Sequence, residues 1–169
     1  MARWCGRSPR ARSKSRRSRR SDSLWSHVNR GSLQKPGLVL GLDEGGSCHG
    51  VAFRIAGHHA VEELRLLWRR EMVLGAYTPR WAAVESGSES LKAIAFFVNR
   101  GHANYAGRLP LETVIKTLVS ARGQLGTPAE YLLETVRGLV EHGVRDPYLL
   151  ELRKRVIAMH PEILPTRTR

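Results

Sequence analysis

The stretch LLWRREMVLGAYTPRW, residues 66–81, decides the fold because in it the sequence passes from a helical to a strand pattern. Apolar residues recur at helical spacing over residues 60–74. The runs TPRWAAVES (78–86) and SLKAIAFFVN (90–99) then predict two strands, joined across the turn Gly87-Ser88. We therefore expect a helix followed by a β-hairpin.

The sequence on either side of this unit completes the prediction. PGLVLGL (36–42) and CHGVAFRI (48–55) are separated by the turn signal Gly45-Gly46, which predicts an earlier hairpin. Helical spacing, bounded by glycines and prolines, predicts three later helices, over 111–122, 126–143 and 146–159. The order ββαββ followed by helices predicts an α+β fold: a small twisted sheet or mixed β-barrel with flanking helices.

Charge divides the chain into a tail and a domain. Nine of the 28 basic residues lie in residues 1–20, which hold no acidic residue, so 19 basic residues face 15 acidic ones in the remainder. A segment so basic and so poor in apolar residues cannot offset the entropy of folding. We expect a disordered Arg/Ser-rich tail over 1–22, one domain over 23–160 and a C-terminal tail over 161–169.

Composition excludes several classes of protein. No apolar run approaches the roughly 18–20 residues of a membrane span, so we expect no membrane segment. Cys5 and Cys48 cannot form a disulfide framework, which favours a reducing compartment. Residues 1–20 lack the apolar core of a secretory signal, and also the apolar face of a mitochondrial transit peptide.

Glu71 is the most informative candidate for chemistry. On a helical wheel it falls in the same arc as Leu64 and Leu67, whereas Arg65 and Arg70 fall at the edge of that arc or beyond it. A carboxylate on a core-facing stripe is rare unless it is paired or catalytic. Two interpretations stay open: a general base, or a structural salt bridge.

Other candidates carry weaker signals. The sequence contains no GxSxG motif, P-loop or dinucleotide-binding glycine pattern, and neither Cys48 nor His49 has a partner at zinc-ligand spacing. Each phenol of Tyr77, Tyr105 and Tyr131 could contact a substrate, although a packed tyrosine is the commoner outcome. We expect no metal site and no cofactor.

Several ordered segments together resemble the ChaC-type, glutathione-specific γ-glutamylcyclotransferases. The resemblance covers about three-quarters of the chain, from Leu24 to Leu149. The segments that carry it are LWS (24–26), RGS (30–32), KPGLVLGLDEGGSCHGVAFRI (35–55), LLWRREMVLGAYTPRW (66–81), FFVNRGHANYAGRLPLE (96–112) and GTPAEYLLETV (126–136).

The resemblance implies a fold, a reaction and site residues. It implies a small β-barrel flanked by helices, in a cytoplasmic lyase that converts glutathione to 5-oxoproline and cysteinylglycine without metal or cofactor. The family's catalytic glutamate lies in an Arg-Glu pair shortly before a Gly-x-Tyr, which corresponds here to Glu71 before Gly75-Ala76-Tyr77. Tyr105, in NYAG, resembles a tyrosine that lines the substrate site of related cyclotransferases.

One departure from the family pattern bears on activity. The family begins with a strand that ends in a Tyr-Gly-Ser-Leu loop, whose amides hold the substrate. Here the basic tail takes that place, so we expect the first strand to be missing. Three explanations stay open: a fragment or frame-shifted product, a variant that supplies the amides from elsewhere, or a non-catalytic pseudoenzyme. The pseudoenzyme would bind nucleic acid or another polyanion non-specifically through residues 1–20.

Overall fold

The computed structural model describes residues 10–13, 18–45, 47–86 and 88–163. These residues form two compact units. Unit 1 contains residues 42–103 together with the chain up to residue 20, and unit 2 contains residues 21–41 and 104 onward. Among the described residues no helix has the length and apolar character needed to cross a bilayer.

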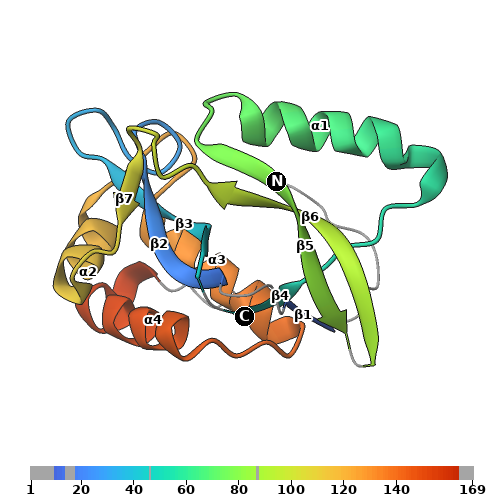
Figure 1. Cartoon of the computed structure of the whole chain (residues 1–169). Coiled ribbons are helices and arrows are strands. Elements are labelled where there is room, and N and C mark those ends of the chain that lie inside the picture. The colour runs from blue at the N-terminus through green and yellow to red at the C-terminus, as the bar shows by residue number, and fades with distance from the viewer. Residues whose placement is uncertain (1–9, 14–17, 46, 87, 164–169) are drawn as a thin grey trace, which may run out of the picture. The chain divides into compact units, whose positions relative to one another are not determined.

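Unit 1 is built on an open sheet (Figure 1). Its described strands follow the order β4-β1-β5-β6-β3, and of β3 only residues 42–44 belong to unit 1. Their bounds are β1 Arg10–Ser13, β3 Gly37–Glu44, β4 Cys48–Val51, β5 Tyr77–Ser86 and β6 Glu89–Val98. β5 and β6 pair as a continuous antiparallel hairpin from Tyr77 opposite Val98 to Ser86 opposite Glu89, which confirms the predicted hairpin.

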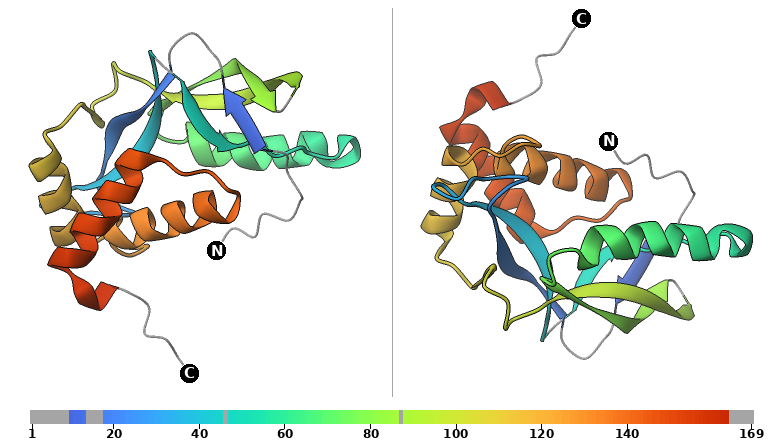
Figure 2. Two further views of the ribbon diagram at one scale, coloured as in Figure 1. Left: turned by 90° about the horizontal axis from the view of Figure 1, so that it is seen from below. Right: turned by 90° about the horizontal axis from the view of Figure 1, so that it is seen from above.

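Helix α1 (Ala60–Met72) is preceded by the short 3₁₀ helix η1 (Gly57–His59) and leads into β5. It runs alongside the β5–β6 hairpin in all three ribbon views (Figures 1 and 2). Leu64 and Leu67 are half-buried on its inner side. None of its residues is fully buried, so its contact with the sheet is shallow.

The predicted hairpin between residues 36–42 and 48–55 is wrong. β3 instead pairs in parallel with β6, Leu42 opposite Phe97, and β4 pairs with β1. The reason is that the strand continues through Asp43, whose side chain is 1% exposed and bound by Arg100. The Gly45-Gly46 turn signal is local, whereas the pairing with β6 depends on a residue far along the chain.

The sheet also differs from two expectations for the fold. The α+β class is confirmed, but the sheet is not closed into a barrel. β1 (Arg10–Ser13) lies within the segment 1–22, for which we expected disorder and no first strand, and β2 (Ser18–Ser26) begins within it. Backbone pairing of β1 with β4 and β5 requires no apolar side chain, which is why composition did not indicate it. Residues 1–9 and 14–17 lie outside the described residues.

Unit 2 holds a large apolar core. Helices α2 (Leu111–Ser120), α3 (Pro128–Glu141) and α4 (Pro147–Met159) confirm the three predicted helices. α3 begins with a capping box between Thr127 and Glu130, and the Asp146 carboxylate accepts a hydrogen bond from the Leu149 N–H at the start of α4. The buried cluster comprises Leu38, Val114, Ile115, Leu118, Ala129, Leu132, Val136, Leu149, Leu152 and Val156.

Two strand segments and a short helix complete unit 2. β7 (Tyr105–Gly107) pairs antiparallel with β2, with Leu24 opposite Tyr105. The 3₁₀ helix η2 (Pro161–Ile163) follows α4. It lies in the segment that we assigned to a C-terminal tail, whose residues 164–169 are outside the described residues.

The Asp43–Arg100 pair predicts a measurable loss of stability when it is broken. Arg100 donates three hydrogen bonds to the two carboxylate oxygens of Asp43, at 2.7–3.0 Å. In Arg100→Met, Asp43 loses this partner in a buried position, so we expect the free energy of unfolding to fall by about 2–3 kcal/mol. Denaturant titration of both proteins measures the difference.

The matched control is Arg137→Met. The carboxylate partners of Arg137 on α3, Glu134 and Glu141, are both exposed. We expect this variant to lose less than about 1 kcal/mol. Equal losses in the two variants would contradict the importance assigned to the buried Asp43 carboxylate.

Candidate functional site

Glu71 lies on the last turn of α1, one residue before the helix ends at Met72. Its side chain is 21% exposed, so the prediction of a core-facing carboxylate is only partly correct. The inner side of α1 is incompletely covered, and the carboxylate therefore stays accessible to a small molecule. The helical wheel could indicate which side Glu71 takes, but not how deeply the helix packs.

The Glu71 carboxylate has one bound and one available oxygen. Arg70 Nε donates a hydrogen bond to Oε1 at 2.7 Å. Within the described part of the chain, Oε2 has no hydrogen-bond partner. A carboxylate at a helix C-terminus lies near the negative end of the helix dipole, and the Arg70 guanidinium offsets that charge. The arrangement leaves Oε2 able to accept a proton from a bound ligand.

A tight turn fixes the chain just after Glu71. The Gly75 N–H donates to the Met72 carbonyl oxygen at 3.2 Å, and Gly75 has φ +66°, a conformation that side-chain-bearing residues rarely adopt. The Asn99 side-chain amide donates to the Gly75 carbonyl oxygen at 3.2 Å, and its N–H donates to the Ala76 carbonyl oxygen at 2.8 Å. The end of α1 is thus tied to the chain that follows β6.

The same segment after β6 is anchored to the buried pair. Arg100, which binds Asp43, directly follows Asn99, and the Gly101 N–H donates to the Asn99 side-chain oxygen at 3.0 Å. Two neighbouring residues in the chain, Arg100 and Asn99, therefore hold Asp43 and the Gly75 turn respectively. Sequence reasoning missed Asn99 and Asp43, because nothing in the spacing of NRG or DEGG indicates such partners.

Tyr105 lies on β7, in unit 2, and is half-buried. Its ring lies beside Gly107, where an added Cβ would come within 3.6 Å of the ring carbon Cε1. Gly107 has φ +62°, so a side chain there would be strained as well as crowded. Glu71 belongs to unit 1, and a site shared by Glu71 and Tyr105 stays a prediction.

The other two tyrosines considered as candidates also belong to different units. Tyr77 begins β5 in unit 1, six residues after Glu71. Tyr131 lies on α3 in unit 2, where the Arg30 guanidinium lies 5.5 Å from the centre of its ring. Arg30 also donates to the Leu125 carbonyl oxygen at 2.6 Å, so this tyrosine is part of a packed structural contact.

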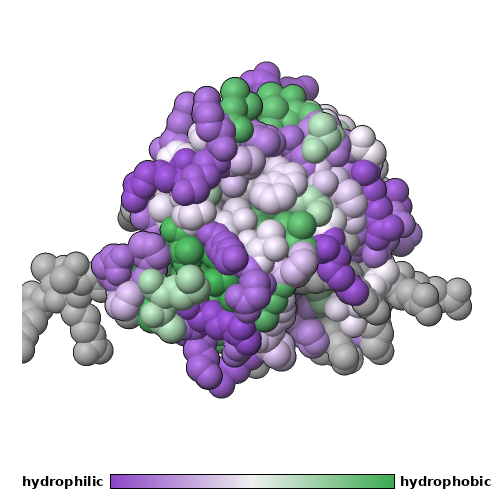
Figure 3. All heavy atoms as spheres, turned by 90° about the vertical axis from the view of Figure 1, so that its left-hand side faces the viewer, coloured by the Kyte–Doolittle hydropathy of each residue, from purple (hydrophilic) through white to green (hydrophobic). Residues whose placement is uncertain are grey.

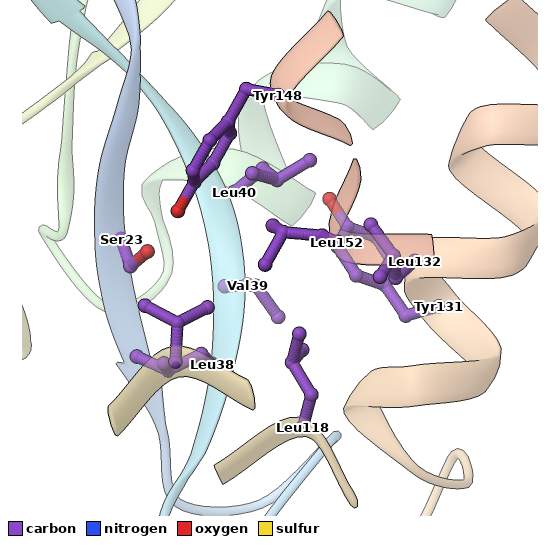
Figure 4. Close-up of a pocket in the computed structure, with 10 residues that line it drawn as sticks. Ser23, Leu38, Val39, Leu40, Leu118, Tyr131, Leu132, Tyr148 and Leu152 are labelled. Carbon is purple, nitrogen blue, oxygen red and sulfur yellow. The ribbon is translucent and has the colours of Figure 1, made fainter. Parts of the chain in front are cut away.

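Unit 2 contains a small cavity of about 20 Å³ (Figure 4). Leucine and valine side chains form most of its wall, and Ser23, Tyr131 and Tyr148 contribute polar groups. The phenol oxygen of Tyr148 points toward the strand that carries Ser23 (Figure 4). Burial, together with the nearby Asp146 carboxylate, raises the pKa of Tyr148. The cavity has room for about one water molecule and cannot hold a tripeptide.

Metal ligation receives no support from the described side chains. Among the residues that the structure describes, no three His, Cys, Asp or Glu side chains are grouped as ligands of one ion. Cys48 is half-buried on β4, and His58 and His59 form part of the 3₁₀ turn before α1.

Comparison with protein families finds one family model that matches most of the chain. The model of the family described as "ChaC-like protein" matches residues 14–159, which include Glu71, Asn99 and Tyr105. The chain belongs to the ChaC-like protein family. This confirms the resemblance drawn from the sequence motifs.

Two relatives of this ChaC-like chain are named after an activity. The chain is 34% identical over 139 residues to the glutathione-specific γ-glutamylcyclotransferase of Escherichia coli K12, covering 82% of this chain and 60% of that protein. It is 30% identical over 145 residues to human glutathione-specific γ-glutamylcyclotransferase 1, covering 82% of this chain and 65% of the human protein. The chain thus spans less than two-thirds of the length of either relative.

A solved structure shows the same fold. The crystal structure of a yeast γ-glutamyl cyclotransferase specific to glutathione superposes with a TM-score of 0.78 at 17% identity, covering 90% of this chain and 88% of that chain. At this level of identity the comparison supports the fold alone.

The Gly75 turn predicts a test of the site's framework. We expect Gly75→Ala to lower the free energy of unfolding by about 1 kcal/mol, because alanine is strained at positive φ. Gly138→Ala is the control, since Gly138 lies within α3 with open space around it. That change should stabilise the chain by about 1 kcal/mol. Stabilisation by both substitutions, measured by thermal or denaturant unfolding, would contradict the turn geometry.

Proposed function

We propose that this chain is a glutathione-specific γ-glutamylcyclotransferase that releases 5-oxoproline and cysteinylglycine. The observation that carries the proposal is the Glu71 carboxylate, partly buried at the end of α1 with Oε2 available. Membership of the ChaC-like family and the names of the two relatives supply the substrate class. The proposed compartment is the cytoplasm, where glutathione keeps thiols reduced.

In the proposed reaction the substrate provides its own nucleophile. Glu71 accepts a proton from the α-ammonium of the γ-glutamyl group, and the freed amine attacks the γ-carbonyl carbon. The new C–N bond closes the five-membered ring, and the bond to the cysteinyl nitrogen breaks. Glu71 returns its proton to that nitrogen, and the second proton that the attacking nitrogen loses on becoming the ring amide passes to it as well. The cysteinyl nitrogen therefore leaves as an ammonium, and no water or redox partner is consumed. A single general base that also acts as acid is sufficient.

The protein's main contribution is then positioning. Folding the γ-glutamyl chain into a near-attack geometry lowers the barrier for an intramolecular reaction, provided that the base does not move away. The hydrogen bonds through Asn99 and Gly75 hold the end of α1 and support this role for Glu71. We propose that the phenol of Tyr105 contacts the substrate from β7.

The carboxylate's role predicts the effect of one substitution. Glu71→Gln keeps the shape of the side chain but cannot accept the proton, so we expect 5-oxoproline release from glutathione to fall by at least about 10²-fold. Circular dichroism should show an unchanged fold. The control is Glu89→Gln, the same change at an exposed residue that begins β6. Turnover retained in Glu71→Gln would reject Glu71 as the base.

The charge of residues 1–20 favours a second candidate function, non-specific binding of polyanions. Nine basic residues in this segment can contact phosphate or sulfate groups without reading a sequence. Under this alternative the chain is a non-catalytic member of the family. It would bind nucleic acid weakly and in a salt-dependent way.

Replacing the nine basic residues of 1–20 by glutamine tests the alternative. The backbone that pairs β1 with β4 is kept, while the positive charge is lost. We expect retention on a heparin column to shift to much lower salt. Unchanged retention would exclude this segment as the polyanion-binding element.

A further inference from the structure

The outer face of α1 exposes apolar side chains. Hydrophobic residues come to the surface of the protein in patches between hydrophilic ones, as the face drawn in Figure 3 illustrates. On α1, Leu66 is 57% exposed, and Val73, at the end of the helix, is 76% exposed. These two residues are seven apart, nearly two helical turns, and therefore lie on one face of the helix. Leu64 and Leu67 occupy the opposite, half-buried side.

Charged residues flank this apolar face in a regular order. Glu62 and Arg69, seven residues apart, lie along one flank, and Glu63 and Arg70, also seven apart, lie along the other. All four are exposed. Each flank is therefore acidic toward the start of α1 and basic toward its end, with Leu66 near the midpoint.

This order is complementary to itself when a second copy is reversed. In an antiparallel pair of helices related by a two-fold axis near Leu66, each flank meets the same flank of the other copy. Glu62 then faces Arg69 of the second copy, Glu63 faces Arg70, and the two Leu66 side chains meet at the centre. A parallel pair would instead place Glu62 opposite Glu63 and Arg69 opposite Arg70, which like-charge repulsion disfavours.

We propose that the outer face of α1 is a self-association surface, on which two copies of this chain form an antiparallel helix pair. The contact is one helix wide, below the roughly 1,200 Å² of a standard interface, so the dimer is weak and reversible. The surface includes Arg70, whose Nε also donates to Glu71 Oε1, whereas no hydrogen bond or ion pair in the described part of the chain joins Glu71 to Glu62, Leu66 or Arg69. The proposal concerns association of two copies and does not depend on the proposed activity.

Sedimentation equilibrium of the full chain over a concentration series provides the test. We expect the apparent mass to rise with concentration from 19.0 kDa toward twice that value. Glu62→Arg alone and Arg69→Glu alone should each raise the dissociation constant at least about tenfold, because each places like charges in contact twice. An equimolar mixture of the two variants should restore association, since every contact then joins opposite charges.

The two variants separate specific pairing from the effect of net charge. Glu62→Arg raises the positive charge of the chain, whereas Arg69→Glu lowers it, so a dimer governed by net repulsion would be weakened by the first and strengthened by the second. Glu134→Arg, the same charge change at an exposed residue of α3, is the control and should leave association unchanged. A chain that stays monomeric at all concentrations, or dimers indifferent to both reversals, would overturn the proposal.

Discussion

The ion pair between Asp43 and Arg100 is the constraint on which the arrangement of unit 1 depends. A carboxylate that is 1% exposed needs a cationic partner, and the guanidinium donates to both of its oxygens. Meeting this need brings the end of β3 to the residues that follow β6, beside the parallel pairing of Leu42 with Phe97. Once Arg100 is held there, its neighbour Asn99 is in place to bind the Gly75 turn.

The Gly75 turn fixes the end of α1, the helix that carries Glu71. Gly75 lies in the turn between α1 and β5 with a positive φ, which suits glycine. The Asn99 side-chain amide donates a hydrogen bond to its carbonyl oxygen. Glu71 lies four residues earlier, where the shallow packing of α1 leaves its carboxylate partly exposed and Arg70 neutralises part of its charge. A carboxylate placed in this way stays accessible while its backbone is held, which is what the proposed intramolecular cyclisation needs from a protein.

Local patterns predicted much of this structure and failed at its long-range contacts. The β5–β6 hairpin and the helices of unit 2 followed from spacing and capping signals, because Thr127, Asp146 and the adjacent prolines determine where those helices start. The predicted hairpin of residues 36–42 with 48–55 is wrong because Asp43 binds Arg100, which lies 57 residues further along the chain. The helical wheel and the family motif predict Glu71 as a candidate, whereas the spacing of residues does not indicate that Asn99 binds the Gly75 turn after it. Strand β1 was missed because its pairing rests on the backbone.

The central claim is that the framework around Glu71 cyclises glutathione. The most direct measurement is release of 5-oxoproline and cysteinylglycine from glutathione by the purified chain, beside a chain in which a Tyr-Gly-Ser-Leu strand replaces residues 1–20. The account predicts the two products in equal amounts from both chains, formed faster by the chain with the restored loop. No product from either chain would contradict it.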